Sequence, residues 1–474
     1  MKYTGFTEEY IDRLHDEALK VLEKVGLCVA HEGALKELKD MGLKVLGDRV
    51  YMAPEFANEQ LQSLLAVIDA KLPHHEPKPT NKISIGCCDM PQYYSDPRTG
   101  EVGQMTCARL IEATKFMENL KDKNAWSMVP GVPRDVPQQL QAITEYFIGT
   151  KYCSNGGNLD TLSPDEAIPY IFEMAEVLER PLRGFGMFTI SPLKIGGFEF
   201  HTALEYRSIF DQFYVSSAPT MGVGSPIYPS VSWVVSIAET LGSIIVLHLL
   251  SGGKPVLAGM GMFPFDLRSM AVVGGAPEYV LMEYNRYLVT KRYNPHNRYT
   301  HTLSTMAKMT GVQSGAEKAY GAAFAVLHGC RDFNGAGLMS FDDIFSPQQV
   351  MADIEIRDMV ERLIADVPEP PQEDWLNLIA EGAETGYMET DATLGAYKDV
   401  YYFPKLFDRS TLHTYNAGHG DRRSPEQKMR DEAVRRIETW SFYPPEDKLE
   451  EVRRIYRKAW EKLAPGAENP MADE

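Results

Sequence analysis

The chain has 474 residues, of which 44% are hydrophobic and 24% charged, a composition typical of globular proteins that excludes disordered or fibrous chains. Acidic residues outnumber basic ones by 66 to 48, which gives a net charge of −18. No basic stretch offsets this charge, so we expect no binding to nucleic acid or to an anionic membrane surface. The six cysteines show neither disulfide-scaffold density nor a Cys-x-x-Cys spacing, and the N-terminus lacks a signal-peptide core. We therefore expect a cytoplasmic protein.

One apolar stretch, residues 231–250, has the length of a membrane span. It contains Glu239 and His248. A carboxylate at the centre of a bilayer costs roughly 3 kcal/mol on insertion scales. The stretch therefore predicts a helix buried against a sheet, in a soluble protein.

The first part of the chain mixes helical and strand patterns. Apolar residues recur at three- and four-residue intervals over residues 7–26 and again over residues 32–41, as expected for amphipathic helices. A strand pattern at residues 50–54 leads into a further helix at residues 55–65. These elements predict an N-terminal α/β cap over residues 1–120.

After residue 120, short apolar runs alternate with helical patterns. Seven such β-then-α units, with a weaker eighth strand candidate near residues 386–388, are the pattern of a parallel (β/α)8 TIM-type barrel in the α/β class. A doubly wound open sheet is the alternative, but no Gly-x-Gly-x-x-Gly follows the first strand. We place the barrel at residues 121–423, followed by C-terminal helices and an acidic tail at residues 424–474. The seven strands are predicted at residues 125–128, 152–155, 184–190, 214–221, 255–262, 299–303 and 332–339.

Several helices of this region begin with a recognisable cap. A serine at the cap and a Glu or Gln three residues later satisfy each other's free backbone N–H groups. Such pairs begin at Ser163, Ser314, Ser346 and Ser424.

The active site of such a barrel lies at the C-terminal ends of its strands. Glycines and aromatic residues dominate these ends, among them Phe188, Tyr228 and Phe263. A ring face attracts a quaternary ammonium by roughly 0.5 to 2 kcal/mol, so two or more of these rings are predicted to face a cationic ligand. The alternative is that they only plug the barrel mouth or pack against helices.

Other chemical motifs are weak. The histidines form neither His-x-x-x-His nor His-Glu-x-x-His, and Gly-x-Ser-x-Gly is absent. The neighbours Cys87 and Cys88 would point to opposite sides of a strand, so they do not predict a shared metal ion. We therefore assign no metal site.

Four further motifs lie along the chain. They are an opening helix at residues 14–26, an Asp-x-x-Thr-Gly stretch at residues 94–101, a barrel helix at residues 311–318, and residues 334–338 followed by residues 346–355. Together these motifs resemble the trimethylamine methyltransferase-like family of corrinoid-dependent methyltransferases, and the resemblance spans nearly the whole chain.

The resemblance implies a reaction and a partner. One branch of the family carries pyrrolysine and demethylates trimethylamine, whereas the other lacks it and acts on quaternary amines such as betaines. This chain has only standard residues over 331–344, so it resembles the second branch. The implied reaction moves one N-methyl group to Co(I) of a corrinoid on a small partner protein that docks at the barrel mouth. The chain has no Asp-x-His-x-x-Gly motif, so we expect no tightly bound cofactor of its own, and we expect a homo-oligomer.

The chemistry agrees with this branch, because a quaternary ammonium releases a neutral amine and needs no general acid. Catalysis would rest on positioning, and no residue is predicted to be catalytic. We expect His301 to bind the substrate carboxylate, with Arg298 as the less favoured choice. The full set of predicted substrate-binding residues is Tyr94, Phe188, Tyr228, Phe263, His301 and Asn334.

Two other functions stay open at this point. A zinc-dependent corrinoid methyltransferase for another methyl donor would need a Cys/His/Glu ligand set. A non-catalytic betaine-binding protein would be a member of a class that is usually exported. The sequence does not choose among glycine betaine, proline betaine, carnitine and γ-butyrobetaine.

Overall fold

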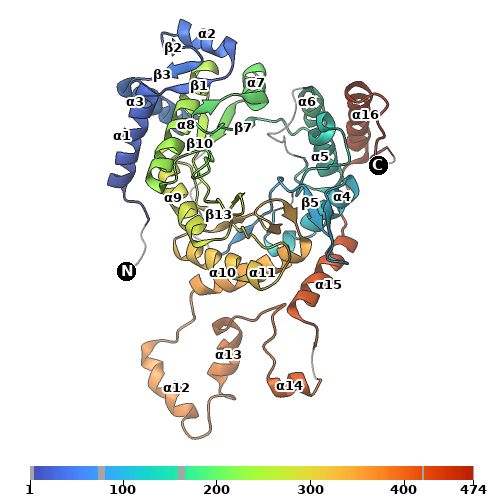
Figure 1. The fold of residues 1–474 in the computed structure, drawn as a ribbon. Coiled ribbons are helices and arrows are strands. Elements are labelled where there is room, and N and C mark those ends of the chain that lie inside the picture. Colours follow the sequence, from blue (N-terminus) through green and yellow to red (C-terminus); the bar gives the residue numbers. More distant parts are fainter. Residues whose placement is uncertain (1–4, 73–80, 127, 158–165, 419–420, 473–474) are drawn as a thin grey trace.

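The structure is a computed structural model that describes residues 5–72, 81–126, 128–157, 166–418 and 421–472. Helices form a ring around short strands, and a segment that follows residue 365 projects from one side of this ring (Figure 1). The chain is a mixed α/β protein, as its sequence predicts.

The N-terminal region combines helices with a small sheet. Thr7 caps the first helix by accepting a hydrogen bond from the backbone N–H of Tyr10. The sheet has the order β2-β3-β1-β8, and the parallel pairing of β1 with β8 attaches this region to the rest of the chain. The elements are α1 (Glu8–Lys24), β1 (Leu27–Val29), α2 (Glu32–Asp40), β2 (Lys44–Leu46), β3 (Arg49–Tyr51), α3 (Pro54–Lys71) and the later strand β8 (Lys194–Ile195).

Two arcs of parallel strands form the centre of the molecule. The first is β7 (Gly184–Phe188), β9 (Gln212–Ser216) and β10 (Val256–Gly259), in the order β10-β9-β7. The second is β13 (Thr300–Thr302), β14 (Asp332–Asn334) and β4 (Ser84–Ile85), in the order β13-β14-β4, with a parallel bridge from Ile85 to Ala125.

Side chains alternate along these strands, as the pleat requires. In β7, Phe185 and Met187 are buried against the outer helices, whereas Phe188 is exposed on the other side. Thr300 and Thr302 likewise flank the buried His301 in β13. The outer side of the strands therefore packs into the core, and the inner side carries the more accessible residues.

Long helices surround the strands. The apolar helix α8 is the centre of one hydrophobic cluster, and 83% of its most apolar 18-residue stretch is buried. This confirms the prediction of a core helix, and α1 packs along it. The outer helices are α4 (Cys107–Glu118), α5 (Gln138–Tyr152), α6 (Ile168–Val177), α7 (Gly197–Glu205), α8 (Pro229–Leu250), α9 (Pro277–Tyr293), α10 (Val312–Leu327) and α11 (Pro347–Ile364).

Short hairpins and a turn of 3-10 helix lie between these elements. A second small sheet has the order β15-β16-β5-β6 and links residues far apart in the sequence. These elements are β5 (Tyr93–Ser95), β6 (Val102–Gln104), η1 (Lys121–Lys123), β11 (Phe265–Asp266), β12 (Ala271–Val272), β15 (Leu338–Met339) and β16 (Ile344–Phe345).

Two of the predicted strands are wrong. Residues 386–388 form a turn instead of a strand. The strand beside β14, on the side away from β13, is β4 at residues 84–85. Residues 152–155 form the end of α5 and a turn rather than a strand. Strand β4 was missed because only two of its residues pair, which is too short for a hydrophobic period to show.

The predicted caps are confirmed in part. Ser346 and Ser424 cap α11 and α15, and Gln427 completes the capping box at Ser424. Ser314 lies at the third position of α10, whose cap is Gly311. Ser163 is outside the described residues.

The C-terminal elements are helical. Helix α15 packs on α11, and α16 packs on α5 and α6, so the end of the chain closes a second hydrophobic cluster. The elements are η2 (Gln372–Asp374), α12 (Trp375–Gly382), α13 (Asp391–Val400), α14 (Leu412–Asn416), α15 (Pro425–Glu438) and α16 (Glu446–Leu463).

Candidate active site

The loops that follow β9, β10, β13 and β14 meet at one end of the parallel strands, which we call the mouth. The backbone N–H of Phe263 donates to Pro219 O at 3.0 Å, and that of Met221 donates to Phe263 O at 2.9 Å. The N–H of Phe341 donates to Thr305 O at 2.8 Å. Loops from different strands are therefore fixed to one another, as a rigid binding site requires.

Three aromatic rings pack together at the mouth. The ring of Phe341 meets that of Phe263 edge to face, with centroids 5.4 Å apart. Tyr279, in the first turn of α9, lies 6.2 Å from Phe341 and stacks on Phe263 at 6.4 Å. We call Phe263, Tyr279 and Phe341 the mouth cluster.

An acidic side chain lies next to this cluster. Asp342 follows Phe341 in the chain and is close enough to Tyr279 and Cys88 to influence the pKa of each. Burial and the neighbouring Asp343 raise the pKa of Asp342 to about 6. The carboxyl group therefore ionises just below neutral pH, which leaves a negative charge beside aromatic rings at pH 7.

A half-buried arginine lies further along α9. Nη2 of Arg286 is 2.9 Å from Oε1 of Glu283, and the side chain of Arg286 is 34% exposed. Burial alone would lower the pKa of Arg286, but the facing carboxylate of Glu283 outweighs it and raises that pKa. Arg286 also influences the pKa of Tyr279, so the arginine neighbours the mouth cluster through this tyrosine.

Arg286 lines a small cavity of about 110 Å³ between β10 and β13. None of the described residues that line it is acidic, although it has two arginines and several hydroxyl groups. A Cβ at Gly259 would collide with the hydroxyl of Tyr214, so glycine is needed where this ring crosses β10. The lining residues are Tyr214, Ser216, Gly259, Met260, Arg286, Tyr287, Thr290, Asn297, Arg298 and Thr300.

His301 does not point into the mouth as we expected. It is only 2% exposed, and its Nδ1 lies 3.4 Å from Oε2 of Glu283 on α9. On the other side, a Cβ at Gly321 of α10 would lie 3.0 Å from Nε2 of His301. Since β13 alternates its side chains, His301 faces the outer helices, and Thr300 and Thr302 face inward.

Tyr94 is also away from the mouth cluster. It is 1% exposed within a hydrophobic cluster, and its hydroxyl donates to Glu112 at 3.4 Å. Burial raises the pKa of Tyr94 well above its usual value. The ring is thus part of the protein core.

The remaining predicted residues are more accessible. Phe188 ends β7 and is 43% exposed, and Tyr228 precedes α8 and is 69% exposed. Asn334 ends β14, where its Oδ1 accepts from the N–H of Gly335 at 2.8 Å. Arg298 lines the small cavity and lies 3.8 Å from Asp332. Of the six residues predicted to bind substrate, only Phe263 belongs to the mouth cluster.

No three His, Cys, Asp or Glu side chains within the described ranges converge on a point where a metal ion could bind. The neighbouring thiols are poor ligands as they stand, because burial raises the pKa of Cys88 to about 12.

A family model, described as "Trimethylamine methyltransferase (MTTB)", matches residues 1–439. The chain belongs to the MTTB family. It is therefore a methyltransferase.

Curated members of the MTTB family carry different substrate names. A glycine betaine methyltransferase of Desulfitobacterium hafniense is 23% identical over 87% of this chain and 88% of its own. A trimethylamine methyltransferase MttB of the same species is 22% identical over 94% of this chain and 91% of its own. A proline betaine:corrinoid methyltransferase of Eubacterium limosum is 21% identical over 84% of this chain and 86% of its own. Among solved structures, the monomethylamine methyltransferase of Methanosarcina barkeri aligns with 91% of this chain and 88% of its own at 12% identity, with a TM-score of 0.47.

Four residues of the candidate site were not predicted from the sequence. Tyr279 and Arg286 lie on a helix, where an aromatic or basic residue gives no sign of which way it faces. Phe341 and Asp342 lie in a loop after β15, and Phe341 adopts a positive φ of 69°. A Phe-Asp pair directly after a predicted barrel strand is the one signal that could have indicated this position.

Proposed function

We propose that this methyltransferase demethylates a betaine-type quaternary amine and transfers the methyl group to a corrinoid carried by a partner protein. The observation that carries this proposal is the mouth cluster of Phe263, Tyr279 and Phe341 beside the carboxyl group of Asp342. Aromatic faces and one carboxylate are the groups that recognise a quaternary ammonium. The betaine names of two relatives support the same substrate class.

The strength of such a site matters for catalysis. The charge on the substrate nitrogen disappears as the methyl group leaves, so a group that binds this charge tightly stabilises the ground state more than the transition state. The three rings of the mouth cluster and one carboxyl group with a pKa of about 6 give moderate binding. The enzyme then accelerates the reaction mainly by holding the methyl carbon in line for transfer, an effect of up to about 7 to 11 kcal/mol.

Arg286 is our candidate for the group that binds the substrate carboxylate, in place of His301. Its cavity of about 110 Å³ has space for a small anion and no acidic lining residue among those described. A guanidinium can hold a carboxylate through two parallel hydrogen bonds. The substrate would thus lie with its ammonium group at the mouth cluster and its carboxylate toward Arg286.

The architecture belongs to the same proposal. We propose that the two parallel arcs are parts of one (β/α)8 barrel, in which β4 is the first strand and Ala125 belongs to the second. The N-terminal cap before it and the helices after residue 423 then flank a single catalytic unit. The corrinoid protein would dock over the mouth, and the cytoplasm is the compartment where we expect both proteins.

One experiment tests the reaction directly. The purified protein is mixed with reduced Co(I) cobalamin or a corrinoid protein and with glycine betaine, proline betaine, carnitine, γ-butyrobetaine or trimethylamine in turn. We expect the corrinoid absorbance to change with at least one betaine and not with trimethylamine. Transfer from trimethylamine at a comparable rate would contradict the substrate class, and binding of a betaine without any transfer would identify a binding protein instead.

A further inference from the structure

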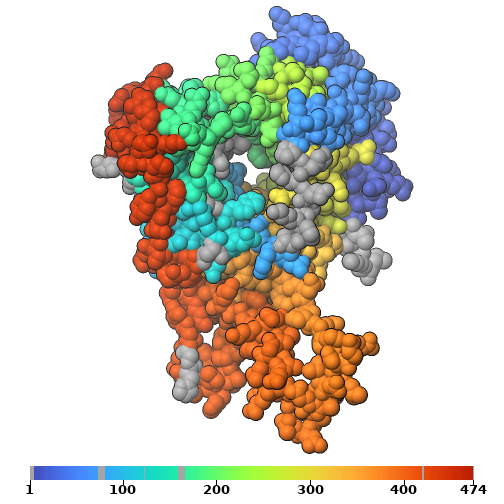
Figure 2. Space-filling view, turned by 180° about the vertical axis from the view of Figure 1, so that it is seen from behind, coloured from blue at the N-terminus to red at the C-terminus, as the bar shows by residue number. Residues whose placement is uncertain are grey.

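A projecting segment with almost no core of its own follows α11. Residues 366–423, which we call the arm, include α12, α13 and α14 and extend away from the ring in both views (Figure 1, Figure 2). Among the described residues of the arm, only Gly382 and Thr390 are buried. Three helices that pack against so little are not expected to be stable alone in water.

The arm exposes large apolar side chains. Leu376, Met388 and Leu412 are 75%, 84% and 74% exposed, respectively. Monomeric soluble proteins rarely gather so many exposed large apolar side chains on one segment, which marks a surface that another molecule covers. The other exposed apolar residues of the arm are Val367, Trp375, Ile379, Tyr387, Leu394, Tyr397, Tyr401, Phe403 and Tyr415.

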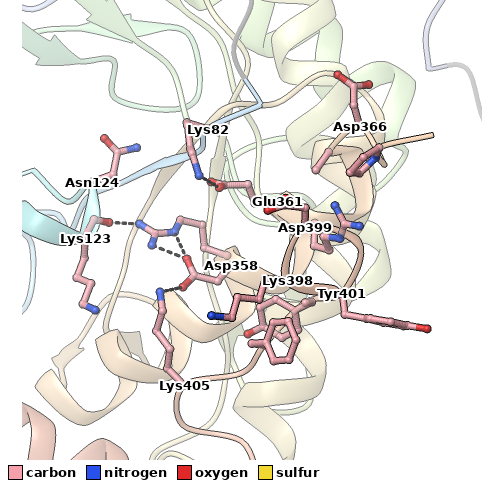
Figure 3. A pocket seen from close by; sticks show the side chains of 16 residues that line it. Lys82, Lys123, Asn124, Asp358, Glu361, Asp366, Lys398, Asp399, Tyr401 and Lys405 are labelled. Carbon is pink, nitrogen blue, oxygen red and sulfur yellow. Dashed lines mark hydrogen bonds and ion pairs between the residues drawn. The ribbon is translucent and has the colours of Figure 1, made fainter. Parts of the chain in front are cut away.

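One part of the arm, residues 402–406, is firmly attached to α11, and we call it the root. The backbone N–H groups of Lys405 and Leu406 each donate to Glu355 at 3.1 Å, and Nζ of Lys405 lies 2.9 Å from Asp358 (Figure 3). Tyr402 also bonds to Glu355. The arm is therefore held in a defined direction, and its exposure is not that of a loose chain end.

The position of this root indicates which molecule covers the arm. Lys82 and Asn124 line the cavity at the root (Figure 3). Lys82 lies two residues before β4, and Asn124 directly precedes Ala125. The root thus lies where the parallel strands begin, at the opposite end from the mouth. A corrinoid protein docked at the mouth does not cover the arm of the same chain.

The charge of the arm is divided between its two halves. Residues 366–391 include eight acidic residues and no basic one, whereas residues 392–423 include five basic and three acidic residues. In a twofold-symmetric contact, each half of one arm can face the other half of its partner. Opposite charges then meet on both sides, which favours this pairing over other contacts.

We propose that the arm is an oligomerisation element, and that the arms of two copies of this chain pack against each other around a twofold axis. Six of the twelve exposed apolar side chains are aromatic and 41 to 60% exposed, so at about 150 to 250 Å² each they provide roughly 450 to 700 Å² per copy. With the six aliphatic side chains added, the arm reaches the roughly 800 Å² that each partner contributes to a standard stable interface. The assignment does not depend on the substrate of the enzyme.

Analytical ultracentrifugation of the full-length protein tests the proposal. We expect the wild type to have at least twice the 53.3 kDa mass of one chain. The variant with Leu376→Asp, Met388→Asp and Leu412→Asp should lose association by at least 100-fold while its far-UV circular dichroism is unchanged. A control with the same added charge, Met41→Asp with Leu327→Asp and Tyr443→Asp, replaces exposed apolar residues elsewhere and should associate like the wild type.

Charge reversal tests the symmetry. One variant has Glu381→Lys and Glu384→Lys, and another has Lys398→Glu and Arg422→Glu. Each alone should remain monomeric at concentrations where the wild type associates, and an equal mixture of the two should recover the dimer. A monomeric wild type, an arm variant that associates normally, or a wild type that associates only after the corrinoid protein is added would each overturn the proposal.

Discussion

The rings of Phe341 and Phe263 meet edge to face at 85°, although the two residues belong to loops after different strands. A positive φ at Phe341 and a hydrogen bond from its N–H to Thr305 hold one ring, and hydrogen bonds to Pro219 and Met221 hold the other. A contact of this kind depends on how separate loops come together, and its proposed use as a cation site can be measured.

Replacing Phe341 or Phe263 by Leu keeps an apolar side chain and removes the ring quadrupole. We expect KM for the quaternary amine to rise roughly 2- to 30-fold, equivalent to about 0.5 to 2 kcal/mol. Phe198→Leu, an exposed aromatic on α7, is the matched control and should leave KM unchanged. Steady-state kinetics that are normal in both mouth variants would rule out this cluster and turn attention to Phe188 and Tyr228.

The pH dependence of KM should report the ionisation of Asp342. Its pKa is raised to about 6, so the carboxyl group is neutral below this pH and charged above it. Since only the charged form attracts the ammonium group, KM should rise as the pH falls through about 6. Asp342→Asn should raise KM about 2- to 10-fold at pH 7.5 and flatten the profile.

A second carboxyl group provides the control for this profile. Asp343 is one of the causes that raise the pKa of Asp342. Asp343→Asn should therefore move the inflection in KM to a lower pH without removing it. An inflection that persists in Asp342→Asn would assign the ionisation to another group.

Arg286→Lys separates charge from geometry at the carboxylate end. A lysine keeps a positive charge near Glu283, so the fold should be preserved, but it lacks the planar fork that binds a carboxylate with two hydrogen bonds. We expect kcat/KM for a betaine to fall roughly 10-fold or more, and that for tetramethylammonium to change little. Equal losses for both substrates would exclude a contact between Arg286 and the carboxylate.

His301→Ala should behave in the opposite way. The imidazole is buried between β13 and two helices, next to Glu283, and its removal leaves a cavity and a carboxylate with one fewer partner. We expect the free energy of unfolding to fall by about 1 to 3 kcal/mol, with equal changes in kcat/KM for betaines and for tetramethylammonium. A loss confined to carboxylated substrates would restore the substrate-binding role that we first expected for this histidine.

The elements of the fold could be predicted where a long period is visible. The amphipathic pattern of α1 and the apolar run of α8 each gave a helix close to its actual bounds. Strand β4 could not be found in this way, because a strand of two residues is too short to show a hydrophobic alternation. Its partner β14 also lies about 250 positions away in the sequence. Long-range pairing of short strands is decided by the surrounding packing, which no local pattern contains.

The candidate site was harder to predict than the fold. Phe263 was found because it follows a strand, whereas the direction of His301 depends on the alternation of β13. A shift of one residue in the assumed strand moves a side chain from the inner to the outer face. Arg286 was missed because it reaches the interior from a helix, through the space between β10 and β13.

The hydrogen bonds that join the mouth loops also have a kinetic consequence. The loops of Phe263 and Phe341 are bonded to neighbouring loops before any substrate arrives. The conformational entropy of these segments is therefore lost when the chain folds, and not when the ligand binds. Substrate should enter a site that is already shaped, so its association rate is set by diffusion through the opening and does not include a loop-ordering step.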